Sequence, residues 1–396
     1  IPFYHYWLRY RAEGGDLPLA HFIPTVHAAE QGLYGPAPGA MGARLPTSAY
    51  HFDAMLYAAF LRRYAEARGV TRREGMMRQC HRNGESGLIE ALGMEDGNRI
   101  EGDFFIDCSG MRARLIGEEM QSPFEDWGDL LPCDRAIALP SEGDGRLAPF
   151  TRATARPAGW QWEIPLRHRT GNGHVYSSAY MEETEALDLL MANLPGRPLG
   201  DPRTIRFRTG MRRGLWQGNC VAIGLSAGFL EPLESTSIHL IQSAIARLIA
   251  LFPDAPQAPG LATEFNRQSD VEYTAVRDFL ILHYHATERD GSAFWRDRRA
   301  MAIPDTLAAK LEMFRETGRI IRTPGDLFDL PNWVQVMWGQ GLRPRAYHPM
   351  VAAVPPGRLA GFIARAGQEV EDRIAALCPH REWIAGEAGG PSGPLH

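Results

Sequence analysis

The stretch GNCVAIGLSAGFLEPLESTSIHLIQSAIARLIALF, residues 218–252, sets out the fold of this chain in a single run. An apolar strand over 219–224 ends at a glycine, and a loop of small residues leads from it into a helix. That helix begins at about Ser237 and keeps apolar residues at helical spacing up to Phe252. Strands that alternate with helices in this way are typical of an α/β sheet protein, and we expect one here.

The end of the same loop carries candidate chemistry. Ser235, Thr236 and Ser237 open the helix, where backbone N–H groups without partners create a partial positive charge. Such an end can hold a halide, a phosphate or the electron-rich edge of a reduced flavin. The alternative is that Ser235 or Thr236 only caps the helix. Glu234 lies just before them, and a carboxylate in an apolar loop requires a partner or a task.

A second stretch, GWQWEIPL (159–166), alternates as a strand does. Trp160 and Trp162 are expected on one face, with Gln161 and Glu163 on the other. Two large aromatic side chains on one strand face either fill the core or separate two compartments.

The remaining pattern predicts a helix over 48–70, with its apolar face on residues such as Phe52, Leu56 and Phe60. Residues 87–110 predict strands joined by an Asp-Gly-Asn turn, and 261–384 are expected to be mostly helical. We expect three parts: an α/β domain over 1–255, a helical substrate-side region over 256–384 and a disordered tail over 385–396.

Composition excludes several classes of function. The chain has 396 residues, 44% of them hydrophobic, and a formal net charge of −5, which disfavours nucleic acid and anionic membranes as partners. No apolar run has the length that a membrane helix needs. The five widely spaced cysteines indicate buried free thiols in a reducing cytoplasm, and they do not form a zinc motif.

These motifs together resemble the flavin-dependent tryptophan halogenase family. EPLEST (231–236) and GWQWEIP (159–165) match its two signatures, and DFFIDCSGMRARLI (103–116) matches its strand-to-loop segment. The resemblance extends from Ile1 to about Pro349. It implies an FAD/NAD(P)-binding Rossmann-like flavin monooxygenase fold with a mainly helical C-terminal cap.

The resemblance also implies site residues. Glu234 matches the catalytic glutamate, and Thr236 and Ser237 match the pair whose backbone amides hold the halide, although the family often has glycine at the second position. Leu225 and Ile238 match flavin-contacting positions.

Two further matches concern the cofactor and its separation from the substrate. Met77 matches the residue whose backbone meets the adenine. Trp160 and Trp162, followed by Ile164 and Pro165, match a barrier that only a halide or hypohalous acid can pass. Plain core packing is the competing interpretation of the tryptophans.

The implied reaction uses reduced FAD, O2 and bromide or chloride to halogenate an electron-rich aromatic such as indole through hypohalous acid. A separate flavin reductase supplies the reduced FAD, and a homodimer is among the assemblies we consider. In this family the GxGxxG loop and the catalytic lysine lie upstream of the point where this sequence begins, so we expect a halogenase without its first hundred or so residues. The one lysine, Lys310, is expected to be a solvated helix residue.

Several alternatives remain open from the sequence. A flavin-dependent aromatic hydroxylase usually has an acid after the strand glycine, where this chain has GLSAG (224–228). A non-catalytic fragment is the second alternative, if Ile1 is the true start. His283 and His285 alternate as on a strand and are interpreted as packing and hydrogen-bonding residues, so we expect no metal site. Trp333 and Trp338 either line an aromatic pocket or pack a helix.

Overall fold

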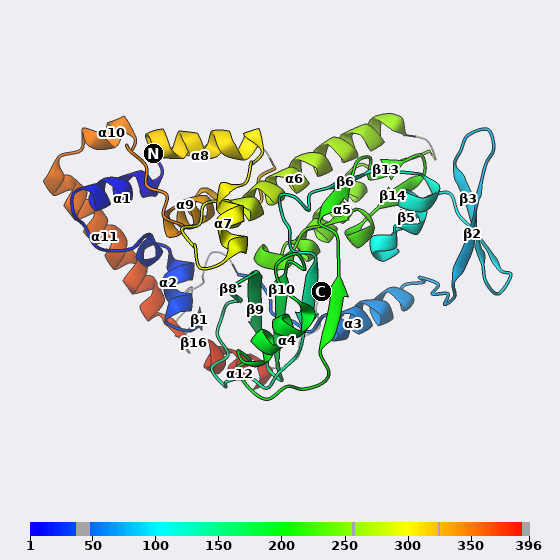
Figure 1. Ribbon diagram of the computed structural model, residues 1–396, viewed down its shortest axis with the longest axis horizontal. Helices are drawn as coiled ribbons and strands as arrows, with labels where there is room; N and C mark the ends of the chain where they lie inside the picture. The colour runs from blue at the N-terminus through cyan, green and yellow to red at the C-terminus, as the bar shows by residue number, and fades with distance from the viewer. Residues whose placement is uncertain (37–47, 256–257, 324, 390–396) are drawn as a thin grey trace.

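A computed structural model describes residues 1–36, 48–255, 258–323 and 325–389, and all structural statements concern these residues (Figure 1). Five sheets carry the strands, and long helices cover one side of the molecule and extend along its length. The sheets and the helices share one large buried core, which includes residues as far apart in the chain as Trp7 and Ile363.

The largest sheet has five antiparallel strands in the order β11-β7-β10-β9-β8. Their bounds are β7 Arg135–Ala138, β8 Arg152–Arg156, β9 Gly159–Pro165, β10 Thr170–Tyr176 and β11 Arg203–Arg206. The prediction of a strand over GWQWEIP is confirmed. Gln161 on the second face of β9 is also buried, because the sheet packs against α4 (Glu183–Met191) on that side and Gln161 donates to the Asn193 carbonyl.

The predicted strand over 219–224 is β14 (Cys220–Ala222), which lies between β13 (Trp216–Gln217) and β5 (Phe105–Asp107). β14 and β5 are parallel, so both strands end at the same edge of the sheet. The loop that follows each strand therefore leaves from this edge, as expected for an α/β arrangement.

Three smaller sheets complete the β-structure. β2 (Met77–Arg82), β3 (Ile89–Met94) and β4 (Arg99–Glu101) form a meander at one end of the molecule, as predicted for 87–110. β6 (Phe124–Asp126), β12 (Gly210–Arg212) and β15 (Gly228–Phe229) form another sheet, and β1 (Leu33–Pro36) pairs with β16 (Leu377–Pro379).

The C-terminal part is mainly helical, as predicted. Its helices are α6 Pro259–His285, α7 Ala293–Ala300, α8 Asp305–Thr317, α9 Leu330–Gly339, α10 Pro349–Ala352, α11 Pro356–Ala375 and α12 His380–Gly389. The N-terminal helices α1 (Phe3–Ala12) and α2 (Pro24–Glu30) lie against α11 (Figure 1). α5 spans Ser237–Ala250, which confirms the helix predicted after EPLEST. None of the described helices combines the length and the apolarity of a membrane span.

The helix predicted over 48–70 is α3, which is shorter (Ala54–Glu66) and has no buried residue. The prediction of its secondary structure is confirmed, but the apolar face that defined it is exposed. Leu56 is 66% exposed and Met55 is 79% exposed. Asp53 caps this helix by accepting the N–H groups of Met55 and Leu56, and Arg169 holds the same carboxylate.

Four further predictions are corrected. Residues 385–389 belong to helix α12, so the disordered tail is wrong there, and 390–396 lie outside the described residues. His283 and His285 lie at the end of helix α6, not on a strand, because the apolar pattern of this segment continues at helical spacing. Lys310 is not solvated: its side chain is 14% exposed and pairs with Asp326 at 3.0 Å. All five cysteines are free, but Cys108 is exposed.

Glycine at position 173 allows the tryptophan strand to pack. In the register of β10 on β9, Gly173 lies opposite Trp162, and a Cβ at this position would overlap the indole ring and lie 2.7 Å from the Ile137 carbonyl oxygen. We predict that Gly173→Ala displaces the Trp162 ring and lowers the free energy of unfolding by about 1–3 kcal/mol. Urea unfolding and the near-UV circular dichroism of tryptophan would measure both effects. Gly171→Ala, on the same strand with its nearest neighbour at 3.5 Å, is the matched control and should change neither.

Candidate functional site

Asp107, a buried carboxylate at the end of β5, holds together the edge of the sheet where the candidate site lies. Asp107 ends β5, and its two oxygens accept the backbone N–H groups of Ser109, Leu115 and Ile116 at 2.8–2.9 Å. Its own carbonyl accepts the hydroxyl of Ser226 and the N–H of Ile223, both from the end of β14 and the loop after it. The loops after two parallel strands are therefore held together by one residue.

The loop then makes a sharp turn in EPLEST. Pro232–Glu234 form one turn of 3-10 helix, and Ser235 follows with φ 54°, a left-handed conformation that a side chain adopts at a cost of about 1–2 kcal/mol. This turn places Thr236 and Ser237 at the first positions of α5. None of the described residues accepts the backbone N–H groups of Thr236 and Ser237, and the Thr236 hydroxyl is buried without a partner. The helix start is therefore an uncapped anion-binding end.

Glu234 has a specific partner. Its Oε1 lies 2.8 Å from Nε2 of His283, and the Nδ1 of the same ring lies 2.8 Å from the Phe279 carbonyl. A carbonyl only accepts, so Nδ1 carries a proton. Nε2 therefore faces Oε1 of Glu234 at ion-pair distance. Glu234 and His283 form a candidate acid–base pair just before the start of α5.

The other acid of the motif has a different environment. Glu231 is completely buried, and neither of its oxygens has a donor at ordinary hydrogen-bonding distance among the described residues. Burial raises the pKa of Glu231 to about 7, although the nearby side chains of Tyr284 and Trp160 act to lower it. Glu231 is thus poised to be neutral, and it lies beside the first tryptophan of the second motif.

The two tryptophans are brought together as predicted. The rings of Trp160 and Trp162 are 6.2 Å apart, and Trp160 is 3% exposed. Ile164 and Pro165 follow toward the far end of β9, so the strand rise puts Pro165 roughly 16 Å from Trp160. Pro165 accepts a hydrogen bond from His51 there. The structure therefore brings Trp160 to Glu231 of EPLEST, with Trp162 beside Trp160, but does not bring Pro165 to the same place.

The residues matched to the cofactor lie on the outer side of the loop. Leu225 and Ile238 are 43% and 42% exposed. Leu225 also borders a cavity of about 320 Å³, together with Met111 and Phe229. An exposed aliphatic residue at a cavity of ligand size fits one face of a flavin ring, whereas Ile238 does not line this cavity.

Met77 is connected to the loop after β5 through hydrogen bonds of Arg114. It begins β2, and its carbonyl accepts a hydrogen bond from Arg114 at 3.3 Å. The Arg114 N–H in turn donates to the Ser109 hydroxyl in the loop after β5. The adenine-binding role that the resemblance implies for Met77 stays a prediction.

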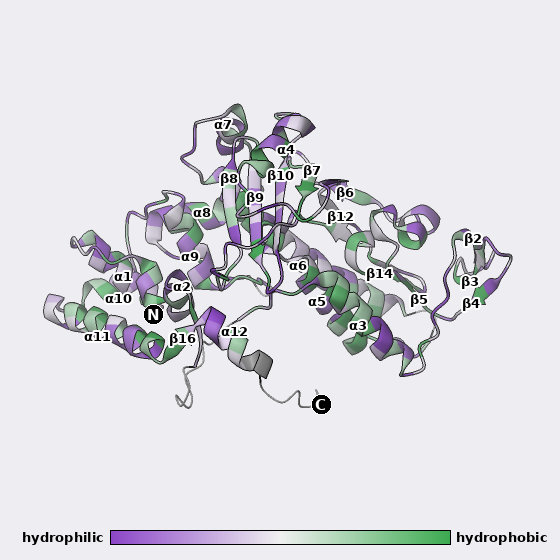
Figure 2. Ribbon diagram, turned by 90° about the horizontal axis from the view of Figure 1, so that it is seen from below, coloured by the Kyte–Doolittle hydropathy of each residue, from purple (hydrophilic) through white to green (hydrophobic). Residues whose placement is uncertain are grey.

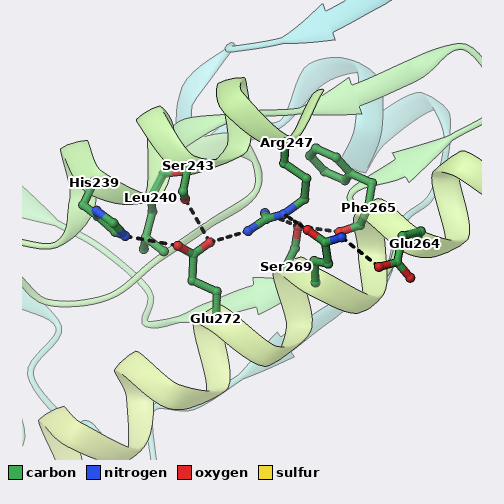
Figure 3. Close-up of polar contacts among 9 residues, drawn as sticks. His239, Leu240, Ser243, Arg247, Glu264, Phe265, Ser269 and Glu272 are labelled. Carbon is green, nitrogen blue, oxygen red and sulfur yellow. Dashed lines mark hydrogen bonds and ion pairs between the residues drawn. The ribbon is translucent and has the colours of Figure 1, made fainter. Parts of the chain in front are cut away.

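A buried ion network joins α5 to α6 (Figure 3). Glu272 on α6 is 8% exposed and accepts from three groups of α5: His239 at 3.1 Å, Ser243 at 2.9 Å and Arg247 at 2.9 Å. Burial alone would raise the pKa of Glu272, but these donors outweigh it and lower the pKa. Because α5 begins at Ser237 and α6 carries His283 near its end, this network fixes the distance between the start of α5 and His283.

The tryptophans of α9 pack the core. Trp333 is 1% exposed and lies edge-to-face with Phe279, and Lys310 lies 4.5 Å above its ring. Trp338 contacts Trp7 at 4.6 Å between rings. Helix packing is therefore the better of the two interpretations for Trp333.

Sequence reasoning missed two functional residues of this arrangement. His283 was assigned to packing and hydrogen bonding without its partner Glu234, and Glu272 was not singled out. Their partners are 49 and 25–33 residues away along the chain, so no local spacing signals them. The only available signal was a buried acid and a histidine on an otherwise apolar helix face.

The buried state of Glu231 predicts a pH-dependent stability. In the unfolded chain this acid ionises near its ordinary pKa of 4.5, while in the folded chain it keeps its proton up to about 7. Its favourable contribution is therefore complete below pH 4.5 and is lost as the pH rises to about 7, by about 3 kcal/mol in total. Glu231→Gln stays neutral, so the stability of the native chain should fall relative to this variant over that window. Urea unfolding at a series of pH values measures it, with exposed Glu185→Gln as the control; parallel curves for the native chain and Glu231→Gln would contradict the assignment.

Comparison with known proteins identifies the family. The family model described as tryptophan halogenase matches residues 1–356. Tryptophan 7-halogenase RebH from Lentzea aerocolonigenes is 36% identical over 79% of this chain and 63% of its own length, and KtzQ, a tryptophan 7-halogenase from a Kutzneria strain, is 40% identical over 69% and 52%. The chain thus spans less than two thirds of the length of these relatives.

Solved structures agree with this result. The flavin-dependent halogenase Xcc4156 from Xanthomonas campestris superposes with a TM-score of 0.94 at 44% identity, covering 99% of this chain and 78% of that one. BrvH, a flavin-dependent halogenase from a Brevundimonas species, gives 0.92 at 45% identity, covering 98% and 79%. These neighbours confirm the predicted FAD-binding Rossmann-like fold with a mainly helical C-terminal part. The chain belongs to the tryptophan halogenase family.

Proposed function

We propose that this chain carries the halide-binding and proton-transfer part of an FAD-dependent halogenase that brominates or chlorinates indole or another electron-rich aromatic. One observation carries the proposal: Oε1 of Glu234 lies 2.8 Å from Nε2 of His283, directly before the uncapped start of α5. An acid–base pair beside an anion-binding helix end meets the two needs of the reaction, a place for halide and a base for the proton that halogen replaces.

Each residue would have a separate role in the reaction. The N–H groups of Thr236 and Ser237 would bind the halide, and Glu234 would take the ring proton of the substrate. Before this step Glu234 would be ionised and His283 neutral, with its proton on Nδ1 and donated to the Phe279 carbonyl; Nε2 would then accept the proton from Glu234 and later release it. Trp160 and Trp162 would separate the substrate side from the cofactor side, so that only a small oxidised halogen species passes.

Leu225, Ile238 and Met77 would hold FAD, which in its reduced form would supply two of the four electrons that reduce O2 to water, the other two coming from the halide. We place the cofactor side within 1–255 and the substrate side within 256–384. A separate flavin reductase would deliver reduced FAD, and the five free cysteines support action in a reducing cytoplasm. Assembly as a homodimer stays a prediction.

The reaction itself is the first test. The protein is incubated with FAD, a flavin reductase, NADH, bromide or chloride and a panel of indoles, and products are identified by mass spectrometry. We expect monohalogenated products that depend on halide and on FAD. Hydroxylated products without halogenated ones would instead support an aromatic hydroxylase, and no product with any member of the panel would support a non-catalytic fragment.

Glu234→Gln tests the base. The amide keeps the size of the side chain but cannot take a proton, so product formation should fall by about 10²-fold or more while oxidation of reduced flavin by O2 continues at its native rate. Both rates can be followed in one assay, with Glu185→Gln as the surface control. Full turnover by Glu234→Gln would remove this residue from the mechanism.

His283→Gln tests its partner. The amide can still donate a hydrogen bond to Glu234 but cannot carry a proton to or from it, so the rate of halogenation should fall by roughly 10-fold or more with flavin oxidation unchanged. His285→Gln, two residues along the same helix, is the matched control and should retain native halogenation. Equal activities for the two variants would show that the pair with Glu234 has no part in turnover.

A further inference from the structure

Two histidines and a glutamate converge away from the halogenation site. His21 lies in the 3-10 turn Leu19–Phe22, His27 lies on α2, and Glu371 lies on α11. One nitrogen from each ring and a carboxylate oxygen all lie within 4.8 Å of one another. In Figure 1, α2 and α11 lie on one side of the molecule, β5 lies toward the other and α5 lies between them, and none of the three residues belongs to the site described above.

The distances within the cluster suit a small cation. Glu371 Oε1 lies 2.9 Å from His27 Nε2 and 3.6 Å from His21 Nδ1. Around a tetrahedral zinc ion with bonds of about 2.0–2.1 Å, neighbouring ligand atoms are about 3.3 Å apart, which lies between these two values. The imidazoles are 18% and 16% exposed and Glu371 is 44% exposed. Solvent therefore reaches the cluster mainly at the carboxylate.

Nε2 of His27 has two polar neighbours in this cluster. It lies 2.9 Å from a carboxylate oxygen of Glu371, which only accepts, and 3.2 Å from the amide nitrogen of Gln31, which only donates. In this orientation of the amide, Nε2 can satisfy one of the two contacts. Rotation of the Gln31 amide would present its oxygen to the same point, where it could accept from a protonated Nε2 or act as a further ligand of a cation.

The surrounding chain shapes this cluster. A Cβ at Gly367, one helical turn before Glu371, would lie 3.2 Å from Nε2 of His21, so glycine lets that ring lie close against α11. This packing turns Nδ1 of His21 toward Glu371. Beneath the cluster, Ala28, Val370 and Ile374 form a small apolar core between α2 and α11.

We propose that His21, His27 and Glu371 form a structural binding site for a divalent transition-metal ion of the zinc type, with Gln31 or water as the fourth ligand. Imidazole and carboxylate ligands suit Zn²⁺, and three protein ligands leave one position open. The ion would tie the N-terminal segment to α11 and so stabilise the folded chain, because a metal that binds only the native state raises its stability.

The test uses tag-free protein treated with a chelator and titrated with Zn²⁺ against a chromophoric competitor, with Tm measured in parallel. We expect one ion per chain and a Tm that rises by a few degrees, both lost in His27→Gln and in the milder, half-exposed Glu371→Gln. His168→Gln, an exposed histidine paired with Asp53, is the control and should bind as the native chain does.

Co²⁺ provides a second measurement that does not depend on the stability of the variants. In the native chain it should give the visible ligand-field bands of a tetrahedral site, and Zn²⁺ should displace it. An absence of stoichiometric binding, or Zn²⁺ binding that is unchanged in both Glu371→Gln and His27→Gln, would overturn the proposal and leave an ordinary histidine–glutamate ion pair.

Discussion

The candidate site depends on one buried ion pair that lies outside it, the contact of Glu272 with Arg247. Both side chains are about one-tenth exposed, and a charge in such a place costs several kcal/mol unless it is paired and hydrogen-bonded. His239 and Ser243 complete the set of donors, so Glu272 is fully satisfied only when α5 lies in one register along α6 (Figure 3). That register determines whether Glu234, just before α5, meets His283, near the end of α6.

Three carboxylates within this region show how the same chemical group acquires different properties. Glu272 has three donors and a lowered pKa, so it is a fixed negative charge. Glu231 has none at ordinary distance, and burial raises its pKa to about 7, so it is close to neutral and can lie beside an indole. Glu234 is about one-third exposed and contacts one histidine at 2.8 Å. Of the three, it alone is both accessible to solvent and next to a side chain that can exchange a proton with it.

The sequence predicted much of this arrangement, for physical reasons that differ between elements. The strand of GWQWEIP and the helix after EPLEST follow from local periodicity, which depends only on neighbouring residues. The Glu234–His283 pair and the cluster of His21, His27 and Glu371 depend on contacts between distant segments, and no local rule reaches across 344 residues. The motifs therefore indicated where the chemistry lies but not which partners complete it.

Helix α3 shows that hydrophobic periodicity can predict a helix without predicting its burial. Its amphipathic pattern predicted a buried apolar face, yet in the described chain none of its residues is buried, and the green of hydrophobic residues marks much of its ribbon in Figure 2. Hydrophobic spacing determines that a segment can be a helix, whereas burial needs a second surface at the right place. What fixes the start of α3 is polar: Asp53 caps it and is held by Arg169 at 2.8 Å, and this partner lowers the pKa of Asp53 to about 2.

For Thr236 and Ser237, the proposed halide ligands, side-chain identity matters least. The proposed ligand is the backbone N–H, which every residue except proline supplies. The orientation of that N–H comes from the left-handed Ser235 before it and from the register of α5 on α6. A change of Ser237 should therefore alter the space around the anion more than the strength with which the anion is held, so any effect on halide preference would arise from size rather than from charge.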